Sequence, residues 1–293
     1  MRTLQRRVGD FLSLVKFSHT VFALPFALLG FFLATLDRGY LDWLTLALVV
    51  LCMVFARSAA MAFNRWLDRR IDGKNPRTAV REIPAGAISS RAALIFVIIN
   101  GLLFVGTTAL LNPLCLALSP VALLVILGYS YTKRFTYLCH FVLGLGLALA
   151  PVGAYLAVTA EWALLPILYG VVVLLWVSGF DIIYALQDES FDRREELFSI
   201  PVRLGARGAL LLGRTLHLAC ALVLVVALVV QHGRYPEFGW LTGFGGAVFL
   251  SLLAYQHTVV SATDLSRVDL AFFTTNGVAS LVFGAVSILD IYV

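Results

Sequence analysis

Three polar residues that could bind a cation follow one another at four-residue spacing, directly after a long apolar run. They are Asn64, Asp68 and Asp72, in the segment NRWLDRRID at residues 64–72. On a helix this spacing places all three side chains along one face. Two carboxylates one turn apart repel each other unless a cation lies between them, and hard oxygen ligands of this kind suit Mg²⁺. The segment therefore predicts a magnesium site.

A second acidic group ends another apolar run. The segment DIIYALQDESFD covers residues 181–192 and contains Asp181, Asp188 and Asp192, with Tyr184 three residues after Asp181 on the same helical side. Either group alone could be a solvated helix end. Carboxylates at the edge of a membrane are costly, however, and are therefore candidates for function. Two such groups at the same depth predict two metal sites around one anion.

Basic residues follow the first acidic group and also end the fourth apolar run. They occur in the segments NPRTAVR (residues 75–81) and YSYTKR (residues 129–134). Lys and Arg bind diphosphate oxygens, Arg often through two parallel hydrogen bonds. Arg81, Lys133 and Arg134 are the candidates for binding such an anion, whereas ordinary charge beside a membrane explains most of the other Arg residues.

The composition requires a membrane protein. Of the 293 residues, 60% are hydrophobic and 13% are charged, against roughly 25% charged in soluble domains. A soluble fold of this length would lack the polar surface to cover itself. The net charge of +5 is explained by the membrane, so we expect no nucleic-acid partner. The four Cys residues lie in apolar stretches without metal-ligand spacing and are interpreted as small buried hydrophobic residues.

Nine apolar runs are long enough to span a bilayer, and helices are favoured because each must satisfy its own backbone hydrogen bonds in lipid. We expect an all-α polytopic membrane protein that forms a single domain over residues 1–293. The runs lie at about 17–36, 41–63, 92–111, 114–131, 137–158, 163–184, 208–230, 238–257 and 270–292.

The charges predict the orientation of these helices. Nearly all of the 22 Lys and Arg residues fall at the N-terminus or in alternate loops, and the other side has only Arg38 and Arg234. The positive-inside rule then places the N-terminus in the cytoplasm and, with nine spans, the C-terminus outside. The two longest loops, at roughly 64–91 and 185–207, are both predicted to be cytoplasmic.

Two polar residues lie inside predicted spans. Arg57 precedes Asn64 by two turns, and burial without a partner would be expensive, so we expect it to be paired or to face a cavity. His19, in the first run, is expected either to line a cavity or to form a hydrogen bond between helices.

The motifs resemble those of the UbiA-type membrane prenyltransferases. The two Asp-rich segments carry this resemblance, together with NPRT and YSYTKR, and it covers nearly the whole chain. It implies nine helices around a central cavity with a cytoplasmic cap made by the two long loops. It also implies that Mg²⁺ and diphosphate are bound by Asn64, Asp68, Asp72, Asp188 and Asp192, with Lys133 near the diphosphate and Asp181 in the pocket.

The resemblance further implies the reaction. A polyprenyl diphosphate would donate its prenyl group to a ring carbon of an aromatic acid, with Arg57, Asp181, Tyr184 and His19 as residues that bind this acceptor. The segments VKFSHTVFALPFAL (residues 15–28) and SIPVRLG (residues 199–205) resemble the quinone-pathway branch. They favour 4-hydroxybenzoate, with a dihydroxynaphthoate as the alternative acceptor, and a place in the bacterial inner membrane with the active site facing the cytoplasm.

Two other classes of membrane protein have similar features. A transporter would also have many helices and buried polar groups, but its site would lie at the membrane midplane between broken helices. A phosphotransferase acting on CDP-alcohols also uses Asp residues on membrane helices, but its longer signature is absent from this sequence. The sequence therefore favours the prenyltransferase.

Overall fold

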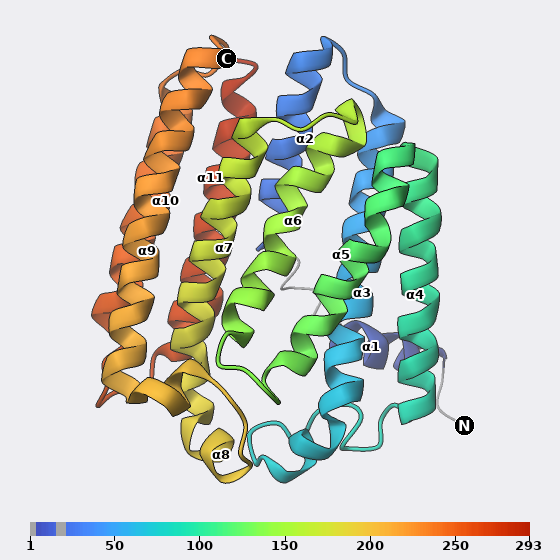
Figure 1. Ribbon diagram of the computed structural model, residues 1–293, viewed down its shortest axis with the longest axis vertical. Coiled ribbons are helices and arrows are strands. Elements are labelled where there is room, and N and C mark those ends of the chain that lie inside the picture. The colour runs from blue at the N-terminus through green and yellow to red at the C-terminus, as the bar shows by residue number, and fades with distance from the viewer. Residues whose placement is uncertain (1–3, 16–21) are drawn as a thin grey trace.

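The protein is a bundle of long helices (Figure 1). The computed structural model describes residues 4–15 and 22–293, and this part of the chain contains helices and no strand. The helices are α1 (Leu4–Leu14), α2 (Leu24–Arg38), α3 (Trp43–Lys74), α4 (Ser90–Leu111), α5 (Pro113–Thr132), α6 (Cys139–Thr159), α7 (Leu164–Ala185), the 3₁₀ turn η2 (Leu186–Asp188), α8 (Glu189–Arg194), α9 (Ile200–Arg234), α10 (Trp240–Val259), the π-helical turn η3 (Leu270–Thr275) and α11 (Asn276–Asp290).

Polar residues between the apolar runs determine where several helices begin. Asp42 accepts a hydrogen bond from the backbone N–H of Leu44 at the start of α3, and Asn112 accepts one from Cys115 at the start of α5. Such side chains satisfy the backbone donors that the first turn of a helix leaves free. The predicted runs at 92–111 and 114–131 therefore agree closely with α4 and α5.

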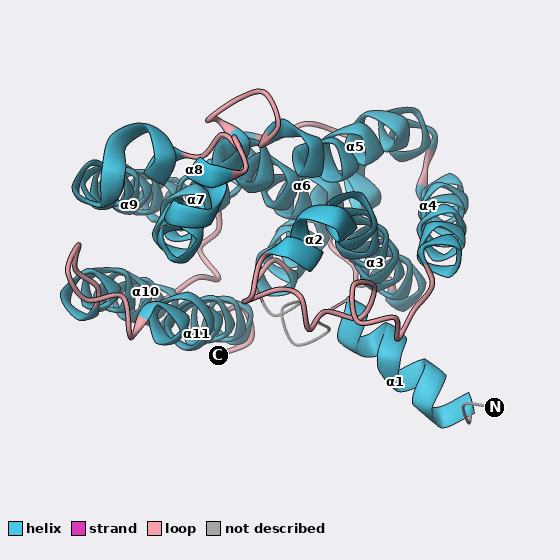
Figure 2. Ribbon diagram, turned by 90° about the horizontal axis from the view of Figure 1, so that it is seen from below, coloured by secondary structure: helices cyan, strands magenta, loops and turns pink. Residues whose placement is uncertain are grey.

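Seven helices in the described part of the chain are long and apolar enough to cross a membrane. Their outer faces carry exposed Leu and Val side chains, such as Leu102, Leu124 and Leu222, as expected of surfaces that face lipid. Figures 1 and 2, which view the bundle at right angles, show α2 and α10 running beside these seven helices. However, α2 has only 15 residues, and α10 does not meet the same criterion. The all-α membrane fold is confirmed, and the count of nine spans stays a prediction.

Small residues allow the helices of the bundle to approach closely. A Cβ atom on Gly30 of α2 would lie 2.2 Å from the carbonyl oxygen of Pro151 in α6. One on Gly144 of α6 would lie 2.7 Å from the carbonyl oxygen of Leu174 in α7. Because helices in lipid gain little from burying apolar surface, such close backbone packing contributes much of their association.

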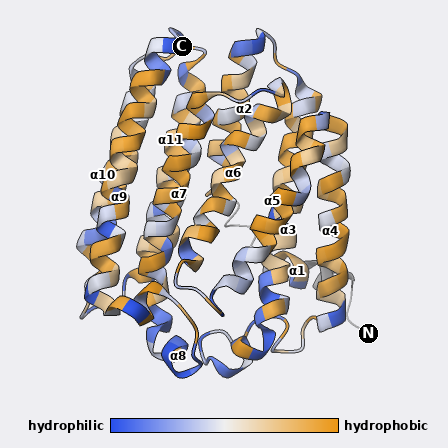
Figure 3. Cartoon of the chain, in the orientation of Figure 1, coloured by the Kyte–Doolittle hydropathy of each residue, from blue (hydrophilic) through white to orange (hydrophobic). Residues whose placement is uncertain are grey.

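The two predicted loops lie at the same end of the bundle, which is the lower end in Figure 1 and is called the α8 end below. The first is shorter than predicted, because α3 stays helical as far as Lys74 and carries the first Asp group with it. The second is largely helical: it contains η2 and α8, and α9 begins at Ile200 and kinks at Gly205, whose φ is 66°. The hydropathy colouring shows a polar α8 end (Figure 3). That this end forms a cap and faces the cytoplasm remains a prediction.

Candidate active site

The first Asp group occupies the last turns of α3 and is buried. Asp68 and Asp72 have relative exposures of 2% and 4%. The Asn64 amide donates a hydrogen bond to Asp68 Oδ2 at 3.5 Å and another to the Ser130 hydroxyl of α5 at 3.3 Å. A continuous helix therefore carries all three predicted residues to the α8 end and fixes their order along one face.

Three basic residues that the sequence singled out form ion pairs with these two carboxylates. Lys133 Nζ is 2.5 Å from Asp68 Oδ2, and Arg134 Nη2 is 2.8 Å from Asp68 Oδ1. Arg81 Nη1 is 2.7 Å from Asp72 Oδ1. Arg81, Lys133 and Arg134, the predicted anion-binding residues, thus lie beside the first Asp group, and their binding of a diphosphate stays a prediction.

Asp188 joins the second group to the first. It lies at the end of η2 and accepts hydrogen bonds from Asn75 Nδ2 and Arg77 Nε, both at 3.0 Å, while Arg77 Nη2 contacts its other oxygen. Arg77 Nη1 donates to the Tyr184 hydroxyl at 3.0 Å. Burial opposes the charge of Arg77, but the hydrogen bonds and attraction to Asp188 outweigh it and raise the pKa of the guanidinium above its ordinary value.

Asp192 and Lys133 complete this connection. Asp192 lies on α8, close enough to the Ser199 side chain for a hydrogen bond and near the charges of Lys133 and Asp188. Since Lys133 also contacts Asp68, it lies between the two acidic groups. The geometry brings Asn64, Asp68, Asp72, Asp188, Asp192, Lys133, Arg134 and Arg81 together at the α8 end.

Asp181 lies apart from Asp188 and Asp192, because α7 ends at Ala185 and η2 interrupts the helix between them. Its side chain pairs with His140 of α6, whose Nδ1 lies 2.7 Å from Asp181 Oδ2. Tyr184 stacks on Phe272 with ring centroids 4.0 Å apart. Asp181 and Tyr184, both predicted to bind the acceptor, thus contact different neighbours, and their binding of the acceptor stays a prediction. The third predicted residue, His19, lies outside the described residues.

The acidic residues suit Mg²⁺ in chemistry and in one feature of their geometry. Asp72 Oδ2 is buried and accepts no hydrogen bond from the described residues, which leaves an oxygen able to coordinate a cation. The described residues nevertheless contain no group of three or more His, Cys, Asp or Glu side chains already arranged around one point. Each of Asp68, Asp72 and Asp188 forms an ion pair with a basic side chain in this arrangement.

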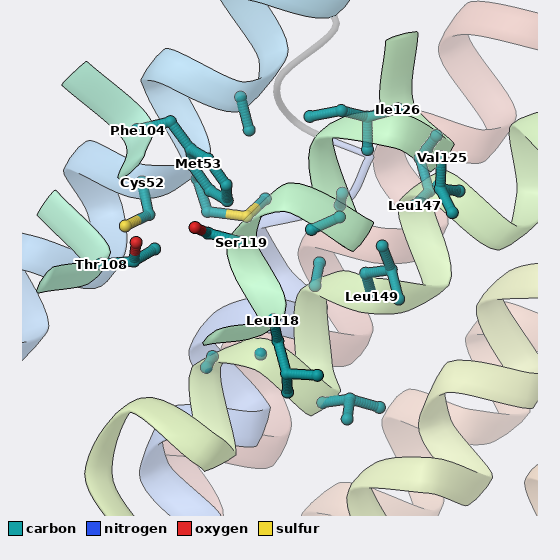
Figure 4. Close-up of a pocket in the computed structure, with 18 of the residues that line it drawn as sticks. Cys52, Met53, Phe104, Thr108, Leu118, Ser119, Val125, Ile126, Leu147 and Leu149 are labelled. Atoms are coloured by element: carbon teal, nitrogen blue, oxygen red, sulfur yellow. The ribbon is translucent and has the colours of Figure 1, made fainter. Parts of the chain in front are cut away.

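An apolar cavity of about 370 Å³ lies between α3, α4, α5 and α6, and none of the acidic residues named above lines it. Its walls are mainly Leu, Val, Ala and Met side chains, and Figure 4 shows Met53, Leu118 and Leu147 among them. Arg57 and Tyr129 are among the polar exceptions, and Arg57 Nε is buried without a hydrogen-bond partner among the described residues. The expectation that Arg57 faces a cavity therefore agrees with the geometry.

Sequence reasoning missed four polar residues of this region. Asn75 and Arg77 hold Asp188, Ser130 holds Asn64, and His140 holds Asp181. The first three lie within segments already singled out, so their motif context was available. The sequence indicated a role for His140 less strongly, through its polar side chain inside a predicted membrane span alone.

The chain matches the model of the UbiA prenyltransferase family over residues 23–278. It is 31% identical over 257 residues to a 4-hydroxybenzoate octaprenyltransferase of Aliivibrio fischeri (strain MJ11), which covers 87% of this chain and 86% of that protein. It is 29% identical over 280 residues to a protein of the same name from Alkalilimnicola ehrlichii, covering 96% of this chain and 89% of the relative.

Solved structures show the same fold. The apo structure of a UbiA homolog from Aeropyrum pernix K1 superposes with a TM-score of 0.83 at 33% identity, covering 93% of this chain and 98% of that one. A UbiA homolog from Archaeoglobus fulgidus, bound to GPP and Mg²⁺, has a TM-score of 0.72 at 20% identity and covers 97% of this chain and 100% of that one. The family match, which spans most of the chain, confirms the prediction of an enzyme, an aromatic prenyltransferase. The chain belongs to the UbiA prenyltransferase family.

Proposed function

We propose that this enzyme transfers a polyprenyl group from a polyprenyl diphosphate to a ring carbon of an aromatic acid, with 4-hydroxybenzoate as the first-choice acceptor, in ubiquinone or menaquinone biosynthesis. The observation that carries the proposal is the meeting of Asp68, Asp72 and Asp188 with Lys133, Arg134, Arg81 and Arg77 at the α8 end. Helix α3, which carries Asp68, and α5, which ends next to Lys133, also line the apolar cavity. The names of the relatives support the acceptor.

The acidic residues would hold Mg²⁺, with Asp68 and Asp72 on one side and Asp188 and Asp192 on the other. Bound there, the metal would supply Lewis-acid stabilisation of the diphosphate. Support comes from the free oxygen of Asp72 and from the A. fulgidus homolog that binds Mg²⁺.

The basic residues would stabilise the leaving group. When carboxylates turn to a cation, Lys133, Arg134, Arg81 and Arg77 are released to bind diphosphate oxygens, and Asn64 can donate a further hydrogen bond. Donors aimed at a charge that grows in the transition state lower the barrier to breaking the allylic C–O bond. The chain thus holds its diphosphate-binding cations in place before the substrate arrives.

The cavity would take the start of the prenyl tail. Its apolar walls offer the tail no hydrogen bonds and would keep water from the allylic carbon as positive charge develops there. A tail longer than the cavity would extend into the lipid.

Arg57 would bind the carboxylate of the acceptor. It lies two turns before Asn64 on α3, about 10 Å along the helix, and no described residue gives its guanidinium an ion pair or a hydrogen bond. A buried cation without a partner is costly unless a ligand supplies the opposite charge. This placement would put the acceptor ring between Arg57 and the diphosphate site.

We also propose that the chain acts as a single domain over residues 1–293 in a bacterial inner membrane. The N-terminus and the α8 end would face the cytoplasm, and the C-terminus would lie outside. At that membrane surface a polar aromatic acid and a lipid diphosphate can both reach the site. The predominance of basic residues in the loops of one side supports this orientation.

The test is product formation by the purified enzyme in detergent. Geranyl and octaprenyl diphosphate are supplied with Mg²⁺ and with either 4-hydroxybenzoate or 1,4-dihydroxy-6-naphthoate. We expect a C-prenylated 4-hydroxybenzoate that disappears when EDTA removes the metal. Product from the naphthoate alone would identify a dihydroxynaphthoate as the acceptor. The absence of both product and diphosphate release would overturn the proposal.

A further inference from the structure

His140 holds Asp181 through a hydrogen bond whose direction the geometry determines. Its Nε2 accepts a hydrogen bond from the backbone N–H of Ile200 at 3.3 Å, and its Nδ1 lies 2.7 Å from Asp181 Oδ2. A ring nitrogen that accepts a hydrogen bond carries no proton. Nδ1 therefore carries a proton, and it donates a hydrogen bond to Asp181 Oδ2.

The pairing leaves Asp181 with a free oxygen. The side chain of Asp181 is 21% exposed, whereas that of His140 is 4% exposed, and no described residue donates a hydrogen bond to Asp181 Oδ1. Asp68 and Asp188, in contrast, each carry a Lys or Arg side chain. Asp181 Oδ1 is therefore available to accept a proton from a ligand.

Asp181 also lies on the acceptor side of the site. The Tyr129 hydroxyl is within range of the charges of Arg57 and Asp181, as well as Asp68. Tyr129 and Arg57 both line the cavity. An aromatic acid whose carboxylate pairs with Arg57 would therefore have Asp181 among the few carboxylates near its ring.

We propose that His140 is a positioning residue that keeps Asp181 Oδ1 directed at the acceptor, and that Asp181 accepts the phenolic proton. This inference rests on the proposed function. As the ring carbon attacks the allylic carbon, the C–C bond forms, and the C–O bond breaks with its electron pair leaving on the diphosphate. The phenolic proton moves to Asp181, which gives a neutral dienone. The proton on the substituted ring carbon then passes to the released diphosphate, and Asp181 returns its proton to the ring oxygen as the ring becomes aromatic again.

The surroundings of His140 contain few other groups that could replace it. The titratable groups near it are Asp181 on α7, Asp192 on α8 and Cys139 on its own helix. Its backbone carbonyl accepts a hydrogen bond from Ser178. The Ile200 contact fixes the ring to the first turn of α9, so the imidazole cannot turn over without losing a backbone hydrogen bond.

The experiment compares two variants with two acceptors of different acidity. H140M removes the donor to Asp181, whereas H140N keeps a donor near the position of Nδ1. Rates are measured with 4-hydroxybenzoate and with 3-fluoro-4-hydroxybenzoate, whose phenol is more acidic, across a range of pH. We expect H140M to lower kcat for 4-hydroxybenzoate by roughly 10- to 100-fold, with the KM for geranyl diphosphate unchanged and with most activity restored in H140N.

The ratio of the wild-type rate to the H140M rate tests whether His140 acts through proton transfer to Asp181. It should fall for the fluorinated acceptor and at higher pH, because an acceptor that is already ionised needs no base. D181N should lose at least as much activity as H140M, and H140M should have little further effect in the D181N background. An equal loss with both acceptors at every pH, or additive losses in the double variant, would overturn the proposal. A wild-type enzyme that prenylates neither acceptor would instead refute the proposed function itself.

Discussion

Each end of the bundle has a polar cluster built around aspartate, and the two clusters differ in how completely their hydrogen bonds are satisfied. At the end opposite α8, Asp37 of α2 accepts hydrogen bonds from the hydroxyls of Tyr155 at 2.5 Å and Tyr235 at 2.9 Å, and from Arg234 Nη2 at 2.9 Å. Arg234 Nε also donates to the Tyr235 hydroxyl. Both carboxylate oxygens of Asp37 are therefore occupied by side chains of neighbouring segments.

The α8 end has polar atoms left over. Asp72 Oδ2, both Nε and Nη1 of Arg65, and Arg57 Nε further along α3 are buried without a hydrogen-bond partner among the described residues. The unpartnered buried atoms near the opposite end belong to uncharged side chains: Gln231 Nε2, Thr242 Oγ1 and Ser287 Oγ. Arg65 is only 4% exposed, and Glu82 and Asp72 are the acidic groups near it. A satisfied polar cluster stabilises a fold, whereas buried charges without partners are costly and persist where a ligand can complete them. We therefore propose a structural role for the Asp37 cluster and, in line with the proposed function, a ligand-binding role for the α8 end.

The largest effect should follow from removing Asp68. Asp68→Ala takes away a central carboxylate and leaves Lys133 and Arg134 without their partner. We expect the rate of prenyl transfer to fall by roughly 100- to 1,000-fold, the scale of a lost electrostatic contribution to a transition state. Initial rates at saturating Mg²⁺ measure the change, and Mn²⁺ binding followed by electron paramagnetic resonance should weaken in parallel.

Asp37→Asn is the matched control for this variant, since it alters an aspartate of the opposite cluster. If both variants lost activity to the same extent, the assignment of different roles to the two ends would be wrong.

A smaller effect is expected for Arg57→Met, which keeps the length of the side chain but removes its charge. We expect the KM for 4-hydroxybenzoate to rise by roughly 10- to 100-fold, because a hydrogen bond to a charged group contributes about 1.5–3 kcal/mol. The KM for geranyl diphosphate should stay the same. Arg70→Met, at an exposed position of the same helix, serves as the control. An unchanged KM for 4-hydroxybenzoate would show that Arg57 does not bind the acceptor.

Arg77→Met should have a moderate effect on the prenyl diphosphate. Arg77 holds Asp188 through two nitrogens, and its side chain is 32% exposed. We expect the KM for geranyl diphosphate to rise by up to about tenfold, and Arg77→Lys to recover only part of this, because Lys lacks the planar fork.

The pH dependence of the Arg77 contribution follows from the direction of its pKa. The folded protein raises this pKa, so the stabilising contact is fully present below the ordinary pKa of an Arg side chain and is lost only above it. The ratio of wild-type to Arg77→Met rates should therefore stay constant between pH 6 and pH 9. A ratio that changed steeply in this range would show that another group controls the contact.

Local sequence patterns predicted most of the helices, because hydropathy and helix-ending residues act over a few turns. The runs at 137–158 and 163–184 agree with α6 and α7 to within a few residues. The apolar run ends at residue 63, whereas α3 continues through polar turns to Lys74, and only the four-residue spacing of Asn64, Asp68 and Asp72 indicated this helical continuation. The amphipathic α1 was missed, because a basic N-terminal segment has no long apolar run.

The site was predictable where its residues repeat along one helix, and unpredictable where they meet through the fold. Asn64, Asp68 and Asp72 share a face by spacing alone. Asp181 has the same kind of spacing to Asp188, but the break at η2 separates them and directs Asp181 to His140, 41 residues away. The contact between Arg77 and Asp188 joins residues 111 positions apart. Such pairs depend on helix packing, which no local pattern contains.

The smallest effect on activity, and a measurable one on stability, is expected for Asp37→Asn. The amide removes the charge that Arg234 contacts. Its single oxygen can no longer accept hydrogen bonds both from Arg234 and from the two Tyr hydroxyls. Because the Arg234 side chain is 58% exposed, solvent screens part of the ion pair, and we expect the Tm in detergent to fall by only a few degrees. Rates and KM values should match the wild type. A loss of prenyl transfer without a change in Tm would mean that the satisfied cluster also takes part in substrate binding, and that complete hydrogen bonding is not enough to mark a structural site in this fold.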